Sequence, residues 1–79
     1  MTAPNNRAQD MGNGTTRIFG NCVFTGENYE CMVPTEGFNK WQAGELVQRS
    51  FPQIPAADRE FLISGISPAG WEKTFGKEN

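Results

Sequence analysis

The side chains that could carry chemistry in this chain are few, and its two cysteines come first. Cys22 and Cys31 are the only cysteines among 79 residues, and there is no histidine. A catalytic cysteine needs a nearby base or cation to stabilise its thiolate, and the sequence places none beside either residue. The missing histidine also removes the commonest general base and a common zinc ligand. The sequence therefore predicts no thiol catalysis.

The carboxylates do not supply a catalytic pair either. Asp58 and Glu60 stand two positions apart in a predicted helix, so their side chains diverge by roughly 200° around its axis. The glycines of residues 12–14 do not form a phosphate-binding loop, because no strand precedes them and no helix follows at the required spacing. We therefore do not expect an enzyme.

A β-hairpin is the element that must position both cysteines. Over residues 16–34 apolar and polar side chains alternate, which is typical of strands with one buried face. Residues 25–28 suit a two-residue type II′ turn, with Gly26 at its first central position. In that register Phe24 would lie opposite Tyr29 on the core face.

The same register determines whether the cysteines could form a disulfide. It makes Cys22 and Cys31 a directly opposed, non-hydrogen-bonded pair, whose Cα atoms would lie about 4.5 Å apart. That distance is at the short end of the range found for disulfides, so a Cys22–Cys31 bridge is geometrically allowed. In a reducing compartment two free, buried thiols are favoured over the bridge.

Residues 35–50 are predicted to form one helix or two half-helices. Thr35 is the expected N-cap, and Phe38 and Trp41 follow each other at helical spacing along one face. Gly44 indicates either close packing or a break in the helix. We expect Trp41 to be buried, with an exposed binding anchor as the alternative.

Two further helices are predicted in the C-terminal part of the chain. Residues 56–64 follow a proline and end at Gly65, which suits the left-handed conformation that terminates helices. Ser67 and Pro68 are a typical N-cap and first-turn pair for a last helix, which should stop at Gly76. The apolar residues of this part that we expect to pack on the hairpin are Phe61, Leu62, Ile66, Trp71 and Phe75.

The two ends of the chain are polar. Residues 1–14 are rich in Asn and Gly and poor in large apolar residues, which predicts a disordered N-terminal tail. Residues 77–79 form a polar C-terminal end. Between the ends we expect one small domain, residues 15–76. The sequence shows neither a signal-peptide h-region nor a membrane-spanning segment, so we expect a cytoplasmic protein without a membrane partner.

The charge pattern argues against nucleic acid as the default partner. Seven Lys and Arg against nine Asp and Glu give a net charge of -2, whereas phosphate binding usually needs a clustered basic surface. Nucleic-acid binding would require scattered basic residues to converge on one face beside an aromatic ring. The basic residues concerned are Arg17, Lys40, Arg49 and Lys73, with Trp41 or Phe19 as the ring.

The longest motif lies in the second half of the chain. It reads FP-x-I-x-x-x-DREFLISG-x-S-P-x-G-W-x-x-x-F and is preceded by GF-x-x-WQ-x-GELVQ. In these motifs the chain resembles a group of small phage and prophage proteins, over about residues 22–75. That resemblance implies a zinc-knuckle-like arrangement, with one C-x-x-C before the helical block and a C-P-x-C within it.

This chain keeps one of the four cysteines of that pattern. The positions that would hold the ligands are Cys22, Thr25, Ser67 and Gly70. A tetrahedral structural zinc needs four thiolate or imidazole ligands, so one cysteine cannot hold it. We therefore expect no metal and no cofactor. The expected fold is α+β and degenerate zinc-ribbon-like, with an N-terminal β-hairpin packed against three short helices.

These observations favour a non-enzymatic protein-binding module. The resemblance implies a small phage-type accessory protein, which could inhibit or modulate a host protein whose identity the sequence does not give. The residues expected at an interface are Trp41, Trp71, Arg49 and Lys40. Two alternatives stay open: a degenerate zinc-ribbon that binds nucleic acid, and a small structural or virion component. The chain could act as a monomer or a small homo-oligomer.

Overall fold

A three-stranded antiparallel sheet and a series of short helices make up the computed structural model, which describes residues 2–76 and the side chains of residues 2–74. The strands are β1 (Arg7–Asp10), β2 (Thr15–Asn21) and β3 (Asn28–Pro34), in the sheet order β1-β2-β3. The helical elements are α1 (Thr35–Gln42), α2 (Val47–Ser50), α3 (Ala56–Ser64), α4 (Pro68–Trp71) and the π-helical segment η1 (Glu72–Gly76). The α+β class expected from the sequence is confirmed.

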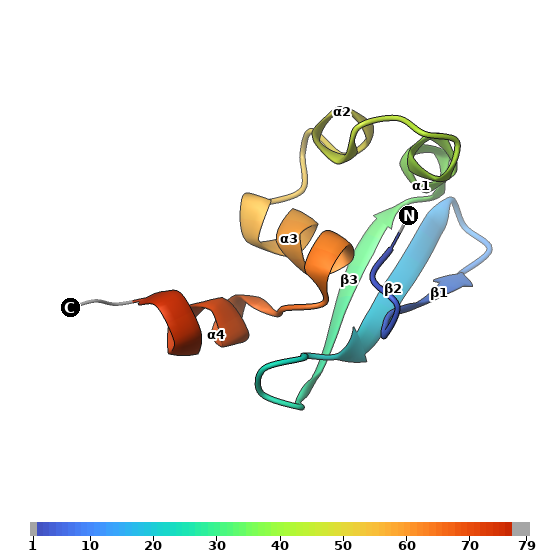
Figure 1. Ribbon diagram of the computed structural model, residues 1–79. Helices are drawn as coiled ribbons and strands as arrows, with labels where there is room; N and C mark the ends of the chain where they lie inside the picture. The colour runs from blue at the N-terminus through green and yellow to red at the C-terminus, as the bar shows by residue number, and fades with distance from the viewer. Residues whose placement is uncertain (1, 77–79) are drawn as a thin grey trace.

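One face of the sheet is buried and the other is open to solvent. Along β2 the side chains alternate, so that Thr16 and Ile18 are buried while Arg17 and Phe19 are only partly covered. In Figure 1, α1 and α2 lie at one end of the sheet and α3 lies beside β3. The buried core residues are Ile18, Cys31, Val33, Trp41, Phe51, Phe61 and Leu62.

Residues 2–14 include a strand and contact α3, whereas the sequence predicted a disordered tail over residues 1–14. β1 pairs with β2, and the segment before it crosses the end of α3. There the backbone N–H of Ala3 donates to the Leu62 carbonyl at 2.9 Å, which the end of a helix leaves free. The Asn6 side-chain amide donates at 3.0 Å to the Phe61 carbonyl, which also accepts from the Gly65 backbone N–H. The polar composition reflects this hydrogen bonding and an exposed edge strand.

The strand register also differs from the expected one. Cys31 lies opposite Ile18, not Cys22, and the last strand pair is Asn21 with Asn28. The ladder is thus displaced by four residues, and the connection is a longer loop over residues 22–27 in place of a two-residue turn. An even displacement keeps the same residues of β3 facing the core, because side chains alternate with period two.

The helices agree largely with their local signals. α3 spans Ala56–Ser64 as expected, and Gly65 follows it with a φ of 80°. Residues 35–50 form two helices, because the chain leaves helical geometry around Gly44, whose φ is 113°. Thr35 is the first helical residue, so the N-cap expected there is Pro34 instead. Within residues 2–76, none of the helices has the length and apolar character needed to cross a membrane.

The expected packing of the C-terminal helices is found in part. Phe61 and Leu62 are fully buried in the core, whereas Ile66 and Trp71 are only partly covered. The Tyr29 hydroxyl of β3 donates to an Asp58 carboxylate oxygen at 2.6 Å, which ties α3 to the sheet. The side chain of Phe75 and the C-terminal end, residues 77–79, lie outside the described part of the chain.

Candidate functional site

The sulfur of Cys22 is the centre of a small polar cluster. It lies at the start of the β2–β3 loop, where it accepts hydrogen bonds from the backbone N–H groups of Phe24 and Ser67, each at 3.4 Å. Thr25 also hydrogen-bonds the sulfur. Gly70 belongs to the same cluster, since a Cβ atom added there would lie 2.5 Å from the Cys22 sulfur. The structure thus brings Cys22, Thr25, Ser67 and Gly70 together.

The start of α4 explains why two of these residues meet the loop. Ser67 is the N-cap of α4, and its hydroxyl accepts a hydrogen bond from the Gly70 backbone N–H at 3.1 Å. This bond closes the first turn of α4, and the Ser67 backbone N–H at the same turn donates to the Cys22 sulfur. Gly70 has no side chain, so the sulfur fills the space that a Cβ would occupy. Local capping chemistry therefore builds one half of the cluster.

Hydrogen bonds to Cys22 change its acidity. Burial alone would raise the pKa of the Cys22 thiol, because it penalises the charged form. Hydrogen bonds from the side chains and backbone of Ser67 and Thr25 outweigh burial and lower this pKa from 9.0 to about 6. The sequence predicted no base or cation beside this thiol, and the groups that lower its pKa are neutral hydrogen-bond donors. The Cys22 side chain is nevertheless 2% exposed, so it is closed to substrates.

The donor set of the cluster does not fit a structural zinc ion. It offers one sulfur, two hydroxyls and a glycine without a side chain, whereas zinc in such sites takes four thiolate or imidazole ligands. The gap that a second thiolate from position 70 would need is closed by the Cys22 sulfur itself. Among residues 2–76, no three His, Cys, Asp or Glu side chains are grouped as metal ligands.

Cys31 has a different environment from Cys22. It lies in β3 opposite Ile18, within the hydrophobic core, and both cysteines are free and buried. Burial, with a smaller contribution from the charge of Asp58, raises the pKa of the Cys31 thiol to about 11. The register that made a Cys22–Cys31 disulfide geometrically allowed is not the observed one. Cys31 therefore acts as a small core residue.

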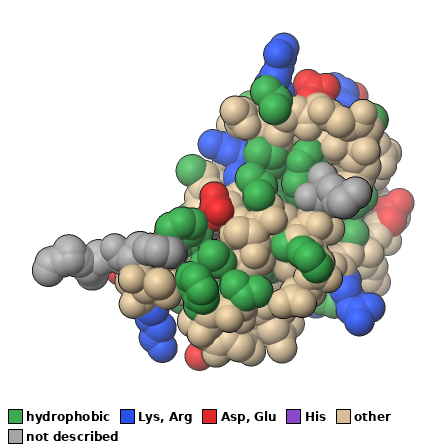
Figure 2. Space-filling view, viewed as in Figure 1, with side chains coloured by type: hydrophobic (Ala, Val, Ile, Leu, Met, Phe, Trp, Pro, Cys, Tyr) green, Lys and Arg blue, Asp and Glu red, His purple; other side chains and the backbone are tan. Residues whose placement is uncertain are grey.

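The sulfur cluster fixes a loop that carries exposed apolar side chains. The Val23 backbone N–H donates to the Gly65 carbonyl at 3.1 Å, so the loop lies against the end of α3. Val23 and Phe24 on the loop are about half exposed, as is Ile63 on α3. We call these three residues the loop–helix surface. Figure 2 shows hydrophobic side chains gathered over α3 and the start of α4 on this side of the molecule.

Sequence reasoning did not find the loop–helix surface. Phe24 was expected to face Tyr29 in the core, but it is 49% exposed because β2 ends at Asn21. Two consecutive apolar residues, Val23 and Phe24, interrupt the alternation that a strand should continue. That interruption was the available signal that the ladder stops before them.

The predicted interface residues lie apart from one another. Trp41 is buried, as expected, with its ring 5.8 Å from that of Phe51 in an edge-on contact, so the alternative of an exposed anchor is not found. Trp71 is partly buried in α4. Lys40 is exposed on α1, 3.9 Å from the Glu36 carboxylate. Arg49 is exposed on α2, 3.9 Å from the Glu45 carboxylate.

The four basic residues of the nucleic-acid alternative do not converge. Arg17 lies on the open face of the sheet, Lys40 and Arg49 lie on α1 and α2, and Lys73 lies in η1. Figure 2 likewise shows Lys and Arg side chains in separate places around the molecule. Of the two rings considered, Phe19 has a guanidinium beside it: the Arg17 carbon Cζ lies 3.9 Å from the centre of the Phe19 ring.

Comparisons with known proteins do not suggest a function, so the proposal below is argued from the site itself. No family model matches the chain, and no curated protein and no solved structure is significantly similar to it. The features that remain for interpretation are the sulfur cluster, the loop–helix surface beside it, and the open face of the sheet.

Proposed function

We propose that this protein is a small non-enzymatic protein-binding module that docks on its partner through the loop–helix surface. The observation that supports the proposal is the exposure of Val23, Phe24 and Ile63 on two elements held together at their contact. Grouped apolar side chains on the surface of a small protein are typical of protein–protein interfaces. Phe24 would be the main anchor, since aromatic residues contribute strongly to binding.

The sulfur cluster gives this surface a defined shape. Cys22 immediately precedes Val23 and Phe24, and its hydrogen bonds with Ser67 and Thr25 fix where the loop leaves the sheet. A loop ordered before binding loses less conformational entropy in the complex. The cluster would therefore contribute to affinity without touching the partner.

The resemblance to small phage proteins supports the type of partner. Within this proposal the chain is a phage accessory protein, and its partner is a protein of the host cytoplasm that it inhibits or modulates. Chemically, the partner must offer an apolar groove that accepts the Phe24 ring.

Capture from a bacterial lysate tests the proposal when it is done with matched variants. Phe24→Ser and Ile63→Ser should each remove the captured partner. Met32→Ser is the control, because Met32 is 46% exposed, nearly as much as Phe24 at 49%, but lies on the open face of the sheet. Quantitative mass spectrometry of the captured proteins provides the measurement.

The proposal fails if the same proteins are captured by the wild type and by Phe24→Ser. It also fails if the surface serves only self-association. In that case sedimentation would show a dimer that Phe24→Ser dissociates, and no host protein would be enriched. The structural-component alternative would then be favoured.

A further inference from the structure

A hollow lies at the end of the sheet's open face, apart from the loop–helix surface. Its volume is about 420 Å³, which is enough for a small organic ligand. The residues that line it are Asn5, Arg7, Phe19, Gly20, Asn21 and Asn28. Three of these are carboxamides, one is a guanidinium, one is an aromatic ring, and none is acidic.

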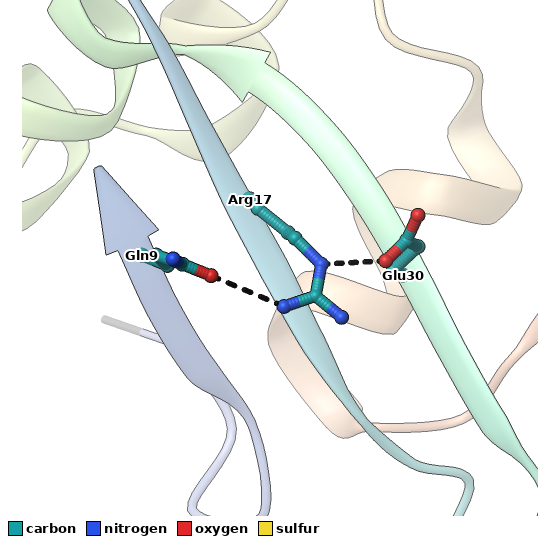
Figure 3. Close-up of polar contacts among 3 residues, drawn as sticks. All are labelled: Gln9, Arg17 and Glu30. Carbon is teal, nitrogen blue, oxygen red and sulfur yellow. Dashed lines mark hydrogen bonds and ion pairs between the residues drawn. The ribbon is translucent and has the colours of Figure 1, made fainter. Parts of the chain in front are cut away.

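The aromatic ring of the hollow is held in place by a polar network. Arg17 stacks on Phe19 at 3.9 Å, and its own guanidinium is fixed by the Glu30 carboxylate at 2.6 Å and by Gln9 at 3.2 Å. Figure 3 shows these three polar residues reaching across the neighbouring strands, with Arg17 in the middle. A ring positioned on an open antiparallel sheet is a stacking surface for a planar group.

The charge of the hollow comes from Arg7. Arg7 lies directly opposite Phe19 in the β1–β2 pairing, so both side chains are on the open face. Within residues 2–76, its side chain takes part in no hydrogen bond or ion pair, unlike that of Arg17. An unpaired guanidinium without a neighbouring acid is a favourable site for a phosphate group.

The carboxamides add directional hydrogen bonding. Asn21 and Asn28 are directly opposed at the end of the β2–β3 ladder, and both are exposed. Each carboxamide offers two donor hydrogens and one acceptor oxygen, which is the combination that the edges of nucleobases require.

From this combination we infer that the hollow binds one nucleotide unit, with the base stacked on Phe19, its edge on Asn21 and Asn28, and its phosphate on Arg7. The unit can come from a free nucleotide or from a single-stranded nucleic acid. The net charge of -2 is compatible with such a site, because one phosphate contact needs no extended basic surface. For a strand, the logarithm of the binding constant should fall with that of the salt concentration with a slope of about -0.7.

Titration of the isotope-labelled protein followed by NMR tests this inference. The probes are adenosine monophosphate, hexauridylate and inorganic phosphate. We expect saturable shifts at Phe19, Asn21 and Asn28 with the first two, and much weaker binding of phosphate alone. Tighter binding of hexauridylate, with shifts extending along the open face to Gln9, would identify a strand as the source. Equal affinity would identify a free nucleotide.

Three variants identify the residues responsible. Phe19→Val should weaken binding by about 5- to 150-fold, which is the effect of removing one stacking ring. Asn28→Asp should also weaken it, because a carboxylate in place of the carboxamide removes both donor hydrogens at the base edge without touching the core. Lys40→Gln is the control, because Lys40 is on α1 and should leave binding unchanged. The inference is overturned if neither nucleotide probe saturates, if phosphate binds equally well, or if the control loses as much as Phe19→Val.

Discussion

Cys22 and Cys31 are both buried, yet the pKa values of their thiols are shifted in opposite directions. Hydrogen bonds from Ser67 and Thr25 stabilise the thiolate of Cys22, whereas the apolar core around Cys31 keeps it a thiol. The difference arises from position. Cys22 lies where the strand ladder ends and polar groups meet it, and Cys31 lies inside the ladder facing the helices.

The low pKa of Cys22 makes stability depend on pH. In the folded protein this pKa is about 6, against 9.0 for an ordinary thiol, so between these values the unfolded chain binds a proton that the folded chain does not. Stability should therefore rise with pH from 6 to 9 and be lost as the pH falls through this window. For one proton the slope is at most about 1.4 kcal/mol per pH unit.

Urea unfolding at several pH values measures this slope. In Cys22→Ser the slope should disappear, because the hydroxyl does not titrate in this range. Cys31→Ala is the matched control and should keep the slope while losing overall stability. A wild-type slope that persists in Cys22→Ser would assign the pH dependence to another group.

Gly70 allows a second test at the scale of single atoms. A Gly to Ala change inside a helix usually stabilises by up to about 1 kcal/mol. Here the new Cβ would lie 2.5 Å from the Cys22 sulfur, so Gly70→Ala should destabilise by about 1–3 kcal/mol. In a Cys22→Ala background much of this penalty should vanish, because the sulfur is gone. A double-mutant cycle by urea unfolding would contradict the close contact if the two effects were additive.

At the scale of elements, the sequence predicts those features that depend on neighbours in the chain. α3 was placed correctly from the preceding proline and the terminal Gly65, and the Ser67 cap was placed correctly from the following Pro68. The register of the hairpin was not, because Cys22 and Val23 leave the ladder to contact Ser67 and Gly65. Such contacts are distant in sequence and leave no local pattern.

For the candidate sites, too, local features could be predicted from the sequence and contacts between distant residues could not. The grouping of Cys22 with position 70 followed only from the resemblance to proteins with paired cysteine motifs. The loop–helix surface was predictable only in part: the consecutive apolar residues Val23 and Phe24 indicate that β2 ends before them, but the contact of this loop with Gly65 is distant in sequence. β1 was missed for a physical reason as well, since all four of its residues are exposed and carry no apolar alternation.

The ordered N-terminal segment can be tested through Asn6. Its side-chain amide donates to the Phe61 carbonyl at 3.0 Å in a buried position, so Asn6→Ala should destabilise the fold by about 1–3 kcal/mol. Asn13→Ala is the matched control, because Asn13 is exposed and should change stability by less than about 0.5 kcal/mol. Equal, negligible effects in thermal unfolding would mean that the segment does not contribute to the fold.

At the scale of the whole molecule, the two proposed binding surfaces use different parts of one sheet-based scaffold. The helices cover one face of the sheet, and the loop–helix surface forms where the β2–β3 loop meets the end of α3. The hollow lies on the open face, where it is lined by strand residues whose side chains point away from the core, such as Phe19, Asn21 and Asn28. A variant in one surface should therefore leave the other intact, which allows the two proposals to be tested independently.

Site-specific photo-crosslinking tests most directly whether the loop–helix surface contacts a partner protein. A photoreactive phenylalanine analogue is placed at position 24 in one protein and at position 32 in another, since Phe24 and Met32 are similarly exposed on different faces. In the bacterial host we predict that position 24 crosslinks to one host protein and that position 32 does not. Equal crosslinking at both positions, or crosslinks from position 24 only to further copies of this chain, would contradict the proposed function.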